Sequence, residues 1–132
     1  MNDIPRLFGT SGVRGIVGKD LSDTLLYDLG RAIATSLAAD SKVVMSHDSR
    51  NSCDCVKTAV QNGLIAGGVN VIHAGMLPTP ALAFATSDMK MDTGIMITAS
   101  HNPPEYNGVK MFTADGIGYS PKEEREIERI YA

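Results

Sequence analysis

Residues 95–112, IMITASHNPPEYNGVKMF, decide the fold of this chain. The apolar run 95–97 predicts a buried strand, and the apolar run 109–112 predicts a second strand after a polar segment. Pro103 and Pro104 can continue neither a strand nor an unkinked helix, so they keep the intervening segment in a loop. Because this loop is too short for a helical crossover, we expect the second strand to run antiparallel to the first.

Helix patterns with recognisable caps lie on both sides of that stretch. Ser22 is expected to cap a helix whose apolar residues recur at helical spacing through residue 37. Thr79 is expected to cap a short helix through residue 84, with Pro80 at its first position. Ser120 and Glu123 form a capping-box pattern before a last helix, whose charged run 122–129 predicts a face exposed to solvent.

Two more strand patterns, 42–45 and 69–72, enclose a helix in which Gly63 and Gly67 share one face. These small residues predict close packing on a sheet, and Gly75 is expected to begin a loop. Continuous apolar strands separated by helices predict an α/β fold, a three-layer domain with a mixed, mostly parallel sheet covered by helices on both faces. With 132 residues, we expect the range 1–132 to form a single domain.

Charge and composition limit the classes of partner. The net charge of -3 gives no basic field for nucleic acid or an anionic membrane surface, so neither is expected as a partner. No apolar run approaches the roughly 20 residues that a membrane span needs, and the first residues lack the apolar core of a signal peptide. Cys53 and Cys55 would diverge on a helix, which disfavours a mutual disulfide and favours reduced thiols in the cytoplasm.

Ser100 follows the first strand, where a core strand becomes a loop. Ligands of α/β sheets bind just outside the carboxyl ends of the strands, so Ser100 is a candidate nucleophile. A hydroxyl needs a base or nearby cations to react, and His101 and Lys110 are candidates for these roles. The alternative is an ordinary loop, in which Asn107 and Gly108 would form a tight turn.

Two other segments carry polar groups suited to anions or to loop support. Residues 7–15, LFGTSGVRG, combine glycines that let a backbone approach an anion with Arg14, whose planar guanidinium fits phosphate oxygens. Their spacing matches neither the dinucleotide fingerprint nor the P-loop, and a glycine-rich turn with a surface arginine is the alternative. In residues 47–50, Asp48 and Arg50 follow a strand, where an ion pair bracing a loop competes with a catalytic role.

These segments resemble the α-D-phosphohexomutases, the phosphoglucomutase/phosphomannomutase family. Residues 98–103 are similar to the family's phosphoserine loop, and residues 7–15 to its opening motif. Residues 46–50 are similar to its Gly-x-Asp-x-Arg segment, with Ser46 in the glycine position, where serine would resist an unusual backbone geometry. The resemblance runs along the whole chain in the right order and covers the first of the family's four domains.

The resemblance implies a phosphate on Ser100 that passes to a hexose phosphate and returns from a hexose 1,6-bisphosphate. The net reaction interconverts hexose 1-phosphate and hexose 6-phosphate. Mg²⁺ is implied as a cofactor, bound to Ser100 through its phosphate and to an aspartate-rich loop of an absent second domain. His101 and Lys110 match family residues near the reacting groups, with Lys110 expected to offset charge and His101 to move or orient a proton.

The resemblance also assigns supporting residues. Arg14 becomes an expected phosphate contact beside Ser100, and the further candidates for binding substrate or phosphate are Thr10, Ser11 and Asn102. Asp48 and Arg50 are expected to support the site without touching substrate.

Several functions stay open at this point. Residues 11, 13 and 98 look more like phosphomannomutases and phosphoglucomutases than bacterial phosphoglucosamine mutases. The remaining domains of the parent enzyme are expected partners, and these 132 residues alone are expected to turn over negligibly. The alternative is a non-catalytic α/β module that binds a sugar phosphate. A serine hydrolase is disfavoured because the Gly-x-Ser-x-Gly elbow is absent.

Overall fold

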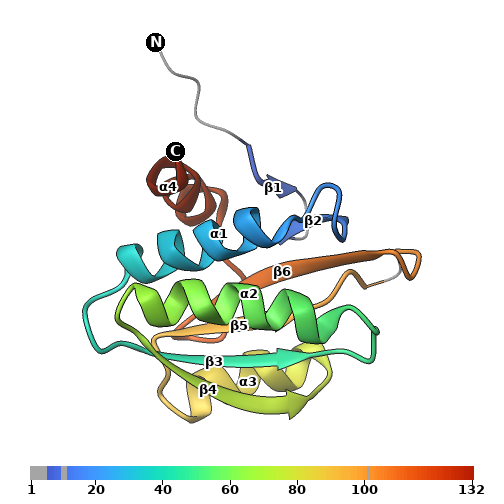
Figure 1. Cartoon of the computed structure of the whole chain (residues 1–132). Helices are drawn as coiled ribbons and strands as arrows, with labels where there is room; N and C mark the ends of the chain where they lie inside the picture. Colours follow the sequence, from blue (N-terminus) through green and yellow to red (C-terminus); the bar gives the residue numbers. More distant parts are fainter. Residues whose placement is uncertain (1–5, 10–11, 101) are drawn as a thin grey trace.

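Six strands form one sheet with the order β1-β2-β6-β5-β3-β4. A computed structural model describes residues 6–9, 12–100 and 102–132 (Figure 1). The strands are β1 (Phe8–Gly9), β2 (Gly12–Ile16), β3 (Lys42–His47), β4 (Asn70–Met76), β5 (Thr93–Ile97) and β6 (Tyr106–Thr113). The helices are α1 (Asp23–Ser36), α2 (Cys53–Ala66), α3 (Thr79–Asp88) and α4 (Pro121–Tyr131).

The sheet divides into a parallel half and an antiparallel half. Strands β5, β3 and β4 run parallel to one another, whereas β6, β2 and β1 join by antiparallel pairing. The antiparallel pairing of β5 with β6 confirms the expectation from the short loop. The mixed α/β sheet is also confirmed, but its antiparallel share is larger than expected. The reason is that the glycine-rich segment, interpreted as a turn, supplies β1 and β2.

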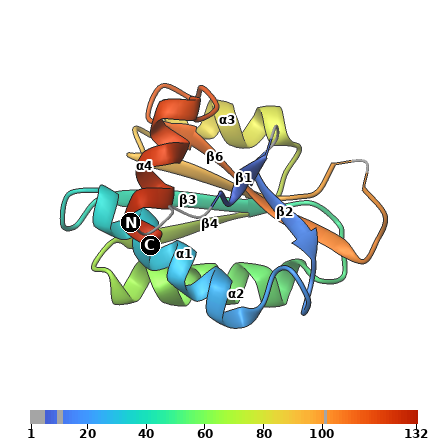
Figure 2. The ribbon, with the colours of Figure 1, turned by 90° about the horizontal axis from the view of Figure 1, so that it is seen from above.

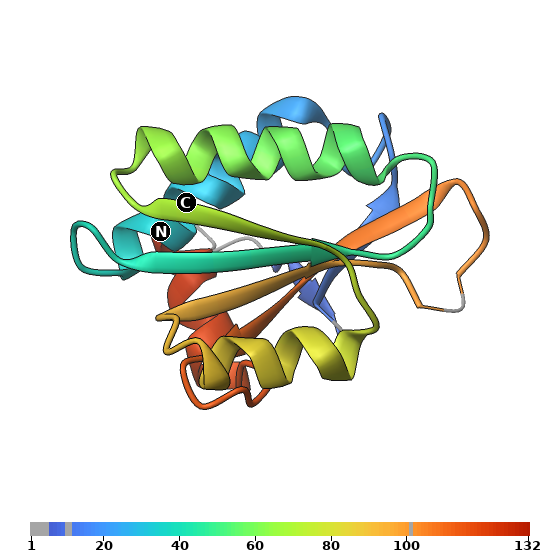
Figure 3. The ribbon, with the colours of Figure 1, turned by 90° about the horizontal axis from the view of Figure 1, so that it is seen from below.

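Helices cover both faces of the sheet, as expected. Helices α1 and α2 lie on one side and α3 lies on the other, which the views from above and below both show (Figures 2 and 3). Successive residues of β5 alternate between the two cores, because side chains of a strand point to opposite faces. Ile95 and Ile97 belong to the larger core under α1 and α2, and Met96 packs with Leu82 in the smaller core under α3.

Glycines of α2 allow a close approach to α1 rather than to the sheet, which corrects the expectation from the sequence. A Cβ at Gly63 would lie 2.1 Å from the carbonyl oxygen of Tyr27, and one at Gly30 would lie 2.3 Å from that of Val60. Gly67 likewise faces Ala34 of α1. The two helices therefore cross at a contact that excludes any larger residue.

The helix caps agree with the sequence at α1 and α4 and differ at α3. The Ser22 hydroxyl accepts a hydrogen bond from the backbone of Leu25, and the capping box of Ser120 is present. Helix α3 begins at Thr79 after Pro78 and extends to Asp88, so the expected cap and end are both wrong. The helix continues because Leu82 and Thr86, one turn apart, are both buried.

Gly75 lies within β4, so the loop begins later than expected. Cys53 and Cys55 are both free, the first buried and the second exposed, which confirms that they do not pair. Among the described residues, no helix has the length and apolar character needed to cross a membrane.

Candidate functional site at the Ser100 loop

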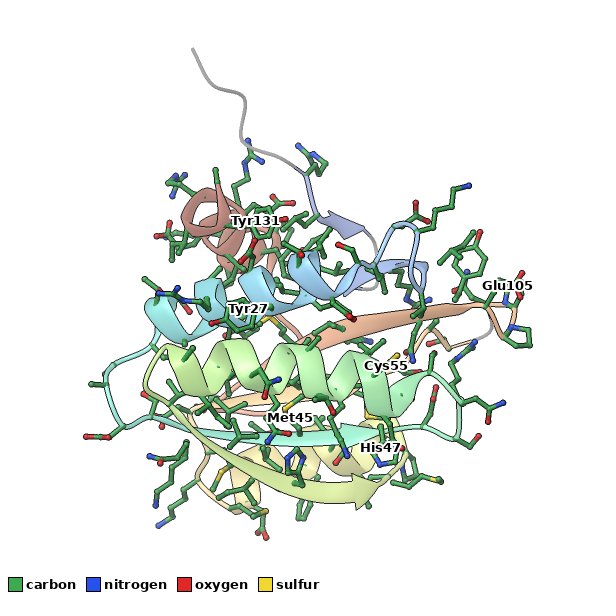
Figure 4. All side chains as sticks on the ribbon, in the orientation of Figure 1. Tyr27, Met45, His47, Cys55, Glu105 and Tyr131 are labelled. Atoms are coloured by element: carbon green, nitrogen blue, oxygen red, sulfur yellow. The ribbon has the colours of Figure 1, made fainter. Side chains whose placement is uncertain are left out.

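The site lies where the parallel strands β3 and β5 end. The backbone N–H of Asp48, just past β3, donates to the carbonyl of Ile97 at the end of β5, at 3.1 Å. This bond joins the start of the β5–β6 loop to the connection between β3 and α2. The loop extends outward from there, with Glu105 at its outer tip and His47 at the end of the neighbouring strand (Figure 4). The expected position outside the strand ends is therefore confirmed for Ser100.

The backbone of Ser100 adopts a left-handed conformation, with φ of 52°. A non-glycine residue there costs about 1 kcal/mol or more, so surrounding contacts must hold it. One of them comes from Thr98, whose hydroxyl accepts from the N–H of Ser100 at 3.0 Å. The same hydroxyl donates to Asp48 at 2.7 Å. The turn leaves Ser100 exposed to solvent, as a residue that reacts with a ligand must be.

Arg50 binds the backbone of this loop at several points. Its guanidinium donates to four backbone carbonyls, those of Ser100 at 2.7 Å, Asn102 at 2.8 Å and Pro103 at 2.8 Å in the loop and that of Tyr106 at 3.2 Å at the start of β6. Only 13% of the Arg50 side chain is exposed. Hydrogen bonds from a charged donor are stronger than neutral ones, so a single side chain fixes the path of the loop.

Asp48 holds Arg50 and Thr98 in place. Its carboxylate lies 3.4 Å from Nε of Arg50, an ion pair that lacks hydrogen-bond geometry. It also accepts from the Arg50 backbone at 3.0 Å and from the Cys53 thiol at 3.2 Å. Burial alone would raise the pKa of Asp48, but bonds from Thr98, Arg50 and Cys53 and the charge of Arg50 hold the pKa below its ordinary value. Asp48 is therefore an ionised support and a poor proton acceptor at neutral pH.

Ser46 does not disturb the loop, contrary to the expectation from its glycine position. It lies within β3, is fully buried and is paired with Met96. Its φ is not among the positive values of the described residues. Strand β3 runs to His47, two residues further than expected. The turn therefore begins after Ser46, the residue in the family's glycine position.

Arg14 reaches the loop from strand β2. Its guanidinium donates to the Ser100 hydroxyl at 3.0 Å, to the Asn102 side-chain oxygen at 2.9 Å and to the carbonyl of Ala99 at 3.2 Å. Burial, and then the nearby charge of Arg50, lowers the pKa of Arg14, although a guanidinium stays charged. A second cation so close to Ser100 favours an anion at its hydroxyl.

Gly108 lets Arg14 cross to the loop, and the sequence interpretation missed this role. Gly108 lies opposite Arg14 in the pairing of β2 with β6. A Cβ there would lie 2.8 Å from Cγ of Arg14 and 2.8 Å from the carbonyl oxygen of Thr98. The absence of a side chain therefore opens the path that the arginine takes over the sheet.

Asn107 also has a role that the sequence interpretation missed. It is fully buried in β6, so the interpretation of residues 107 and 108 as a tight turn was wrong. Its amide donates to Ser52 at 2.9 Å and to the sulfur of Cys53 at 3.5 Å. These bonds fasten the start of α2 to β6, and so fix the connection that carries Arg50.

Lys110 is not brought against Ser100. Its nitrogen lies 5.6 Å from the centre of the Phe112 ring, and it makes no hydrogen bond to the loop among the described residues. It does share a face of β6 with Gly108, the face that Arg14 crosses. His101, Thr10 and Ser11 lie outside the described residues. The structure thus joins Ser100, Asn102 and Arg14 by direct hydrogen bonds. Arg50 binds the backbone of Ser100 and is paired with Asp48.

A hollow of about 500 Å³ adjoins the loop. It is lined by Arg6, Leu7, Phe8, Gly9, Gly12, Arg14 and Asn102. Two guanidinium groups make it a suitable place for an anion. A hollow of similar size, about 460 Å³, lies between α1 and α2, but Asp23 and Asp54 line it and would repel phosphate.

No group of three His, Cys, Asp or Glu side chains in the described part of the chain is placed to hold a metal ion. Ser100, once phosphorylated, would offer oxygen atoms of the kind that Mg²⁺ prefers. Such a group would fit a metal site only together with ligands from outside the described residues.

Fold and site together define an α/β/α domain with a cationic serine loop at the strand ends. Residues 5–132 match the family model described as "Phosphoglucomutase/phosphomannomutase, alpha/beta/alpha domain I", and the chain belongs to this family. The family named from the sequence is thereby confirmed.

The chain is similar to curated and solved relatives along nearly its whole length. It is 46% identical over 125 residues to a "Probable phosphoglucosamine mutase" of Pyrococcus abyssi, covering 95% of this chain and 28% of that protein. A crystal structure of a "putative phosphomannomutase" from Thermus thermophilus superposes with a TM-score of 0.88 at 35% identity, covering 100% of this chain and 31% of that one. The chain therefore spans less than a third of the length of these relatives.

Proposed function

We propose that this chain is the phosphoserine-bearing N-terminal domain, 1–132, of an enzyme that interconverts hexose 1-phosphate and hexose 6-phosphate. The observation that carries the proposal is the exposed Ser100 hydroxyl, held 3.0 Å from Nη2 of Arg14 by a loop in a strained conformation. Strained residues that many contacts hold in place are typical of reactive sites.

The proposed chemistry moves one phosphoryl group at a time. A sugar hydroxyl attacks the phosphorus on Ser100; a new sugar–phosphate bond forms and the bond to Oγ breaks. The sugar hydroxyl loses its proton to a base, and Oγ takes up a proton and leaves as the serine hydroxyl. The resulting bisphosphate reorients and returns its other phosphate to Ser100. Such transfers depend mainly on positioning and charge neutralisation, which Arg50 and Arg14 supply. Lys110 is proposed to offset phosphate charge, and His101 is proposed to move or orient a proton.

Mg²⁺ and hexose 1,6-bisphosphate belong to the same proposal. The metal would neutralise charge on the phosphate of Ser100, with its other ligands outside this domain. Asn102 and Arg14 would bind phosphate oxygens, together with Thr10 and Ser11. Asp48 and Arg50 would hold the loop in shape.

The proposed substrate is a hexose phosphate as a class. The names of the relatives divide between glucosamine and mannose sugars, so the preference drawn from residues 11, 13 and 98 is not confirmed. The remaining domains of the chain are proposed partners, and the 132 residues alone would turn over negligibly. A cytoplasmic location stays a prediction, favoured by the free thiols.

Phosphosite mapping of the natural gene product tests the proposal. The protein is incubated with Mg²⁺ and the 1,6-bisphosphates of glucose, mannose and glucosamine in turn, then digested and analysed by mass spectrometry. We expect phosphate on Ser100 in the wild type and none at this position in Ser100→Ala. The control is Ser87→Ala, which replaces an exposed serine of α3 and should leave the phosphate on Ser100. Absence of phosphate with every donor would refute the mutase.

A non-catalytic sugar-phosphate module is the second candidate, because the hollow lined by Arg6 and Arg14 could bind an anion without reaction. It predicts that hexose phosphates bind, by calorimetry, to Ser100→Ala as tightly as to the wild type while no phosphoserine forms.

A further inference from the structure

The carboxylate of Glu128 joins the last helix to the first described residues. It is only 3% exposed. One oxygen accepts hydrogen bonds from the backbone N–H groups of Leu7 and of Phe8, the latter at 3.1 Å and 120 residues away in sequence. The other oxygen accepts from Arg125 at 3.2 Å. The sequence pattern had placed this residue on a solvated face, which the structure contradicts.

Glu128 is ionised in this position. Burial would raise the pKa of its carboxyl, but the N–H groups of Phe8 and Leu7 and the charge of Arg125 hold the pKa below its ordinary value. A buried charge is costly unless its partners satisfy it, so removing the carboxylate would leave two N–H donors near the core unpaired.

The anchored backbone leads directly to the site. Phe8 lies opposite Val13, and Gly9 lies opposite Gly12, in the pairing of β1 with β2. The next residue of β2 is Arg14, which donates to Ser100. Residues 7–9 and 12 also line the hollow beside Ser100. Holding Leu7 and Phe8 therefore fixes both one wall of the hollow and the strand that carries the arginine.

Helix α4 is itself firmly placed. Ile127, next to Glu128, is 1% exposed and belongs to the larger core. Two views show α4 beside β1 and across α1 (Figures 1 and 2). A rigid helix that bonds to a two-residue strand is a mechanical anchor for it, since β1 is too short to be stable by its own pairing.

We propose that Glu128 is a positioning residue that fixes the β1–β2 pair for phosphoryl transfer at Ser100. The anchoring stands on the hydrogen bonds to Leu7 and Phe8, and the link to transfer rests on the proposed function. Glu128 acts through backbone groups and Arg14, and touches no reacting atom.

Hydrogen exchange on the natural gene product tests the anchoring. In Glu128→Ala we expect amides of residues 7–9 and 12–14 to exchange about tenfold faster or more, because the half-buried donor of Leu7 and the buried donor of Phe8 lose their acceptor. Glu128→Gln keeps one acceptor oxygen, so we expect a smaller change, and this variant carries the test if Glu128→Ala does not fold. Amides of α2 should be unchanged.

Two variants of the same helix serve as controls. Glu126→Gln removes an exposed carboxylate paired with Arg129 and should leave exchange in residues 7–14 unchanged. Arg125→Ala removes the ion pair but spares the bonds to the backbone, so exchange should change far less than in Glu128→Ala. Equal effects of Arg125→Ala and Glu128→Ala, or no change in Glu128→Ala, would overturn the anchoring.

Single-turnover phosphorylation of Ser100 tests the link to transfer. Per folded molecule, we expect the rate in Glu128→Gln to fall about tenfold, because a small misplacement of Arg14 weakens its contact with phosphate. A purely structural role would reduce the folded fraction but leave this rate unchanged, which would overturn the link. A wild type that never becomes phosphorylated would refute the proposed function and the link, whereas exchange decides the anchoring independently.

Discussion

Two segments reach the Ser100 loop, and they hold it by different atoms. The connection from β3 to α2 contributes Arg50, which donates to backbone carbonyls. Strand β2 contributes Arg14, which donates to the side-chain oxygens of Ser100 and Asn102 as well as to one carbonyl. A carbonyl is present whichever residue occupies the position, whereas a side-chain oxygen is specific to the residue. Arg50 therefore sets the backbone conformation of the loop, whereas the bonds of Arg14 depend on which side chains stand at positions 100 and 102.

The electrostatic surroundings of the two arginines differ as well. Arg50 lies against the carboxylate of Asp48. Arg14 is repelled by the charge of Arg50, and burial together with this charge lowers the pKa of Arg14. A phosphate on Ser100 would reduce this repulsion. The anion should therefore stabilise the charge of Arg14 more than that of Arg50, which already lies against a carboxylate.

Replacing Arg50 should have the largest effect. In Arg50→Ala the carbonyls of Ser100, Asn102, Pro103 and Tyr106 lose their donor, and Ser100 keeps the contact with Thr98 but loses the one with Arg50. We expect the free energy of unfolding to fall by about 2–4 kcal/mol. Phosphorylation of Ser100 should slow about a thousandfold, because both geometry and charge are lost. Denaturant titration and single-turnover phosphorylation measure the two effects.

Arg50→Lys is the matched control, because it keeps the positive charge and removes the planar guanidinium. A lysine keeps the positive charge but cannot present the fork that reaches four carbonyls. We expect it to recover little of the lost rate. A lysine variant with nearly wild-type phosphorylation would show that charge alone matters, and would remove the distinction between the two arginines.

Replacing Arg14 should slow transfer with little loss of stability. In Arg14→Ala the loop keeps the bonds from Arg50, so the free energy of unfolding should change by less than about 1 kcal/mol. Transfer to Ser100 should slow about a hundredfold, as when one donor to a developing charge is removed. Asn102→Ala serves for comparison, since it removes one acceptor of Arg14 and spares its bond to Ser100. A loss of unfolding free energy in Arg14→Ala as large as that in Arg50→Ala would contradict the assignment of loop shape to Arg50 and of phosphate contact to Arg14.

Local patterns along the sequence predicted much of this site. The short loop between two apolar runs predicted the antiparallel pairing of β5 with β6, and the family resemblance led us to expect Asp48 and Arg50 as supports of the Ser100 loop. The strain at Ser100 could not be predicted, because it depends on donors from Arg50, 50 residues away in sequence. Local propensity contains no information on such a contact.

Three further residues show why the rest could not be predicted. Asn107 and Gly108 have the composition of a turn, yet they lie in a central strand where three strands meet. Glu128 stands in a charged helical run, yet it is buried by the N-terminal segment. In each case the tertiary neighbour decides the role, and a pattern that counts only near residues gives the commoner interpretation.

Replacing Asp48 should give the smallest effect, one that depends on pH. The pKa of Asp48 is lowered in the folded protein, so its stabilisation is present above the ordinary pKa of about 3.9 and is lost as pH falls through the lower folded value. Asp48→Asn should therefore be less stable than the wild type by about 1 kcal/mol at neutral pH, with transfer slowed less than about tenfold because Arg50 remains.

Urea titrations from pH 7 to pH 2 check the sign of this dependence. The difference in unfolding free energy between wild type and Asp48→Asn should narrow below about pH 4, because protonation removes the charge that the substitution also removes. Glu128, whose pKa is lowered too, is intact in both proteins, so its titration cancels in the difference. A difference that stays constant to pH 2 would mean that Asp48 acts by shape alone, and that Arg50 needs no carboxylate to hold the loop.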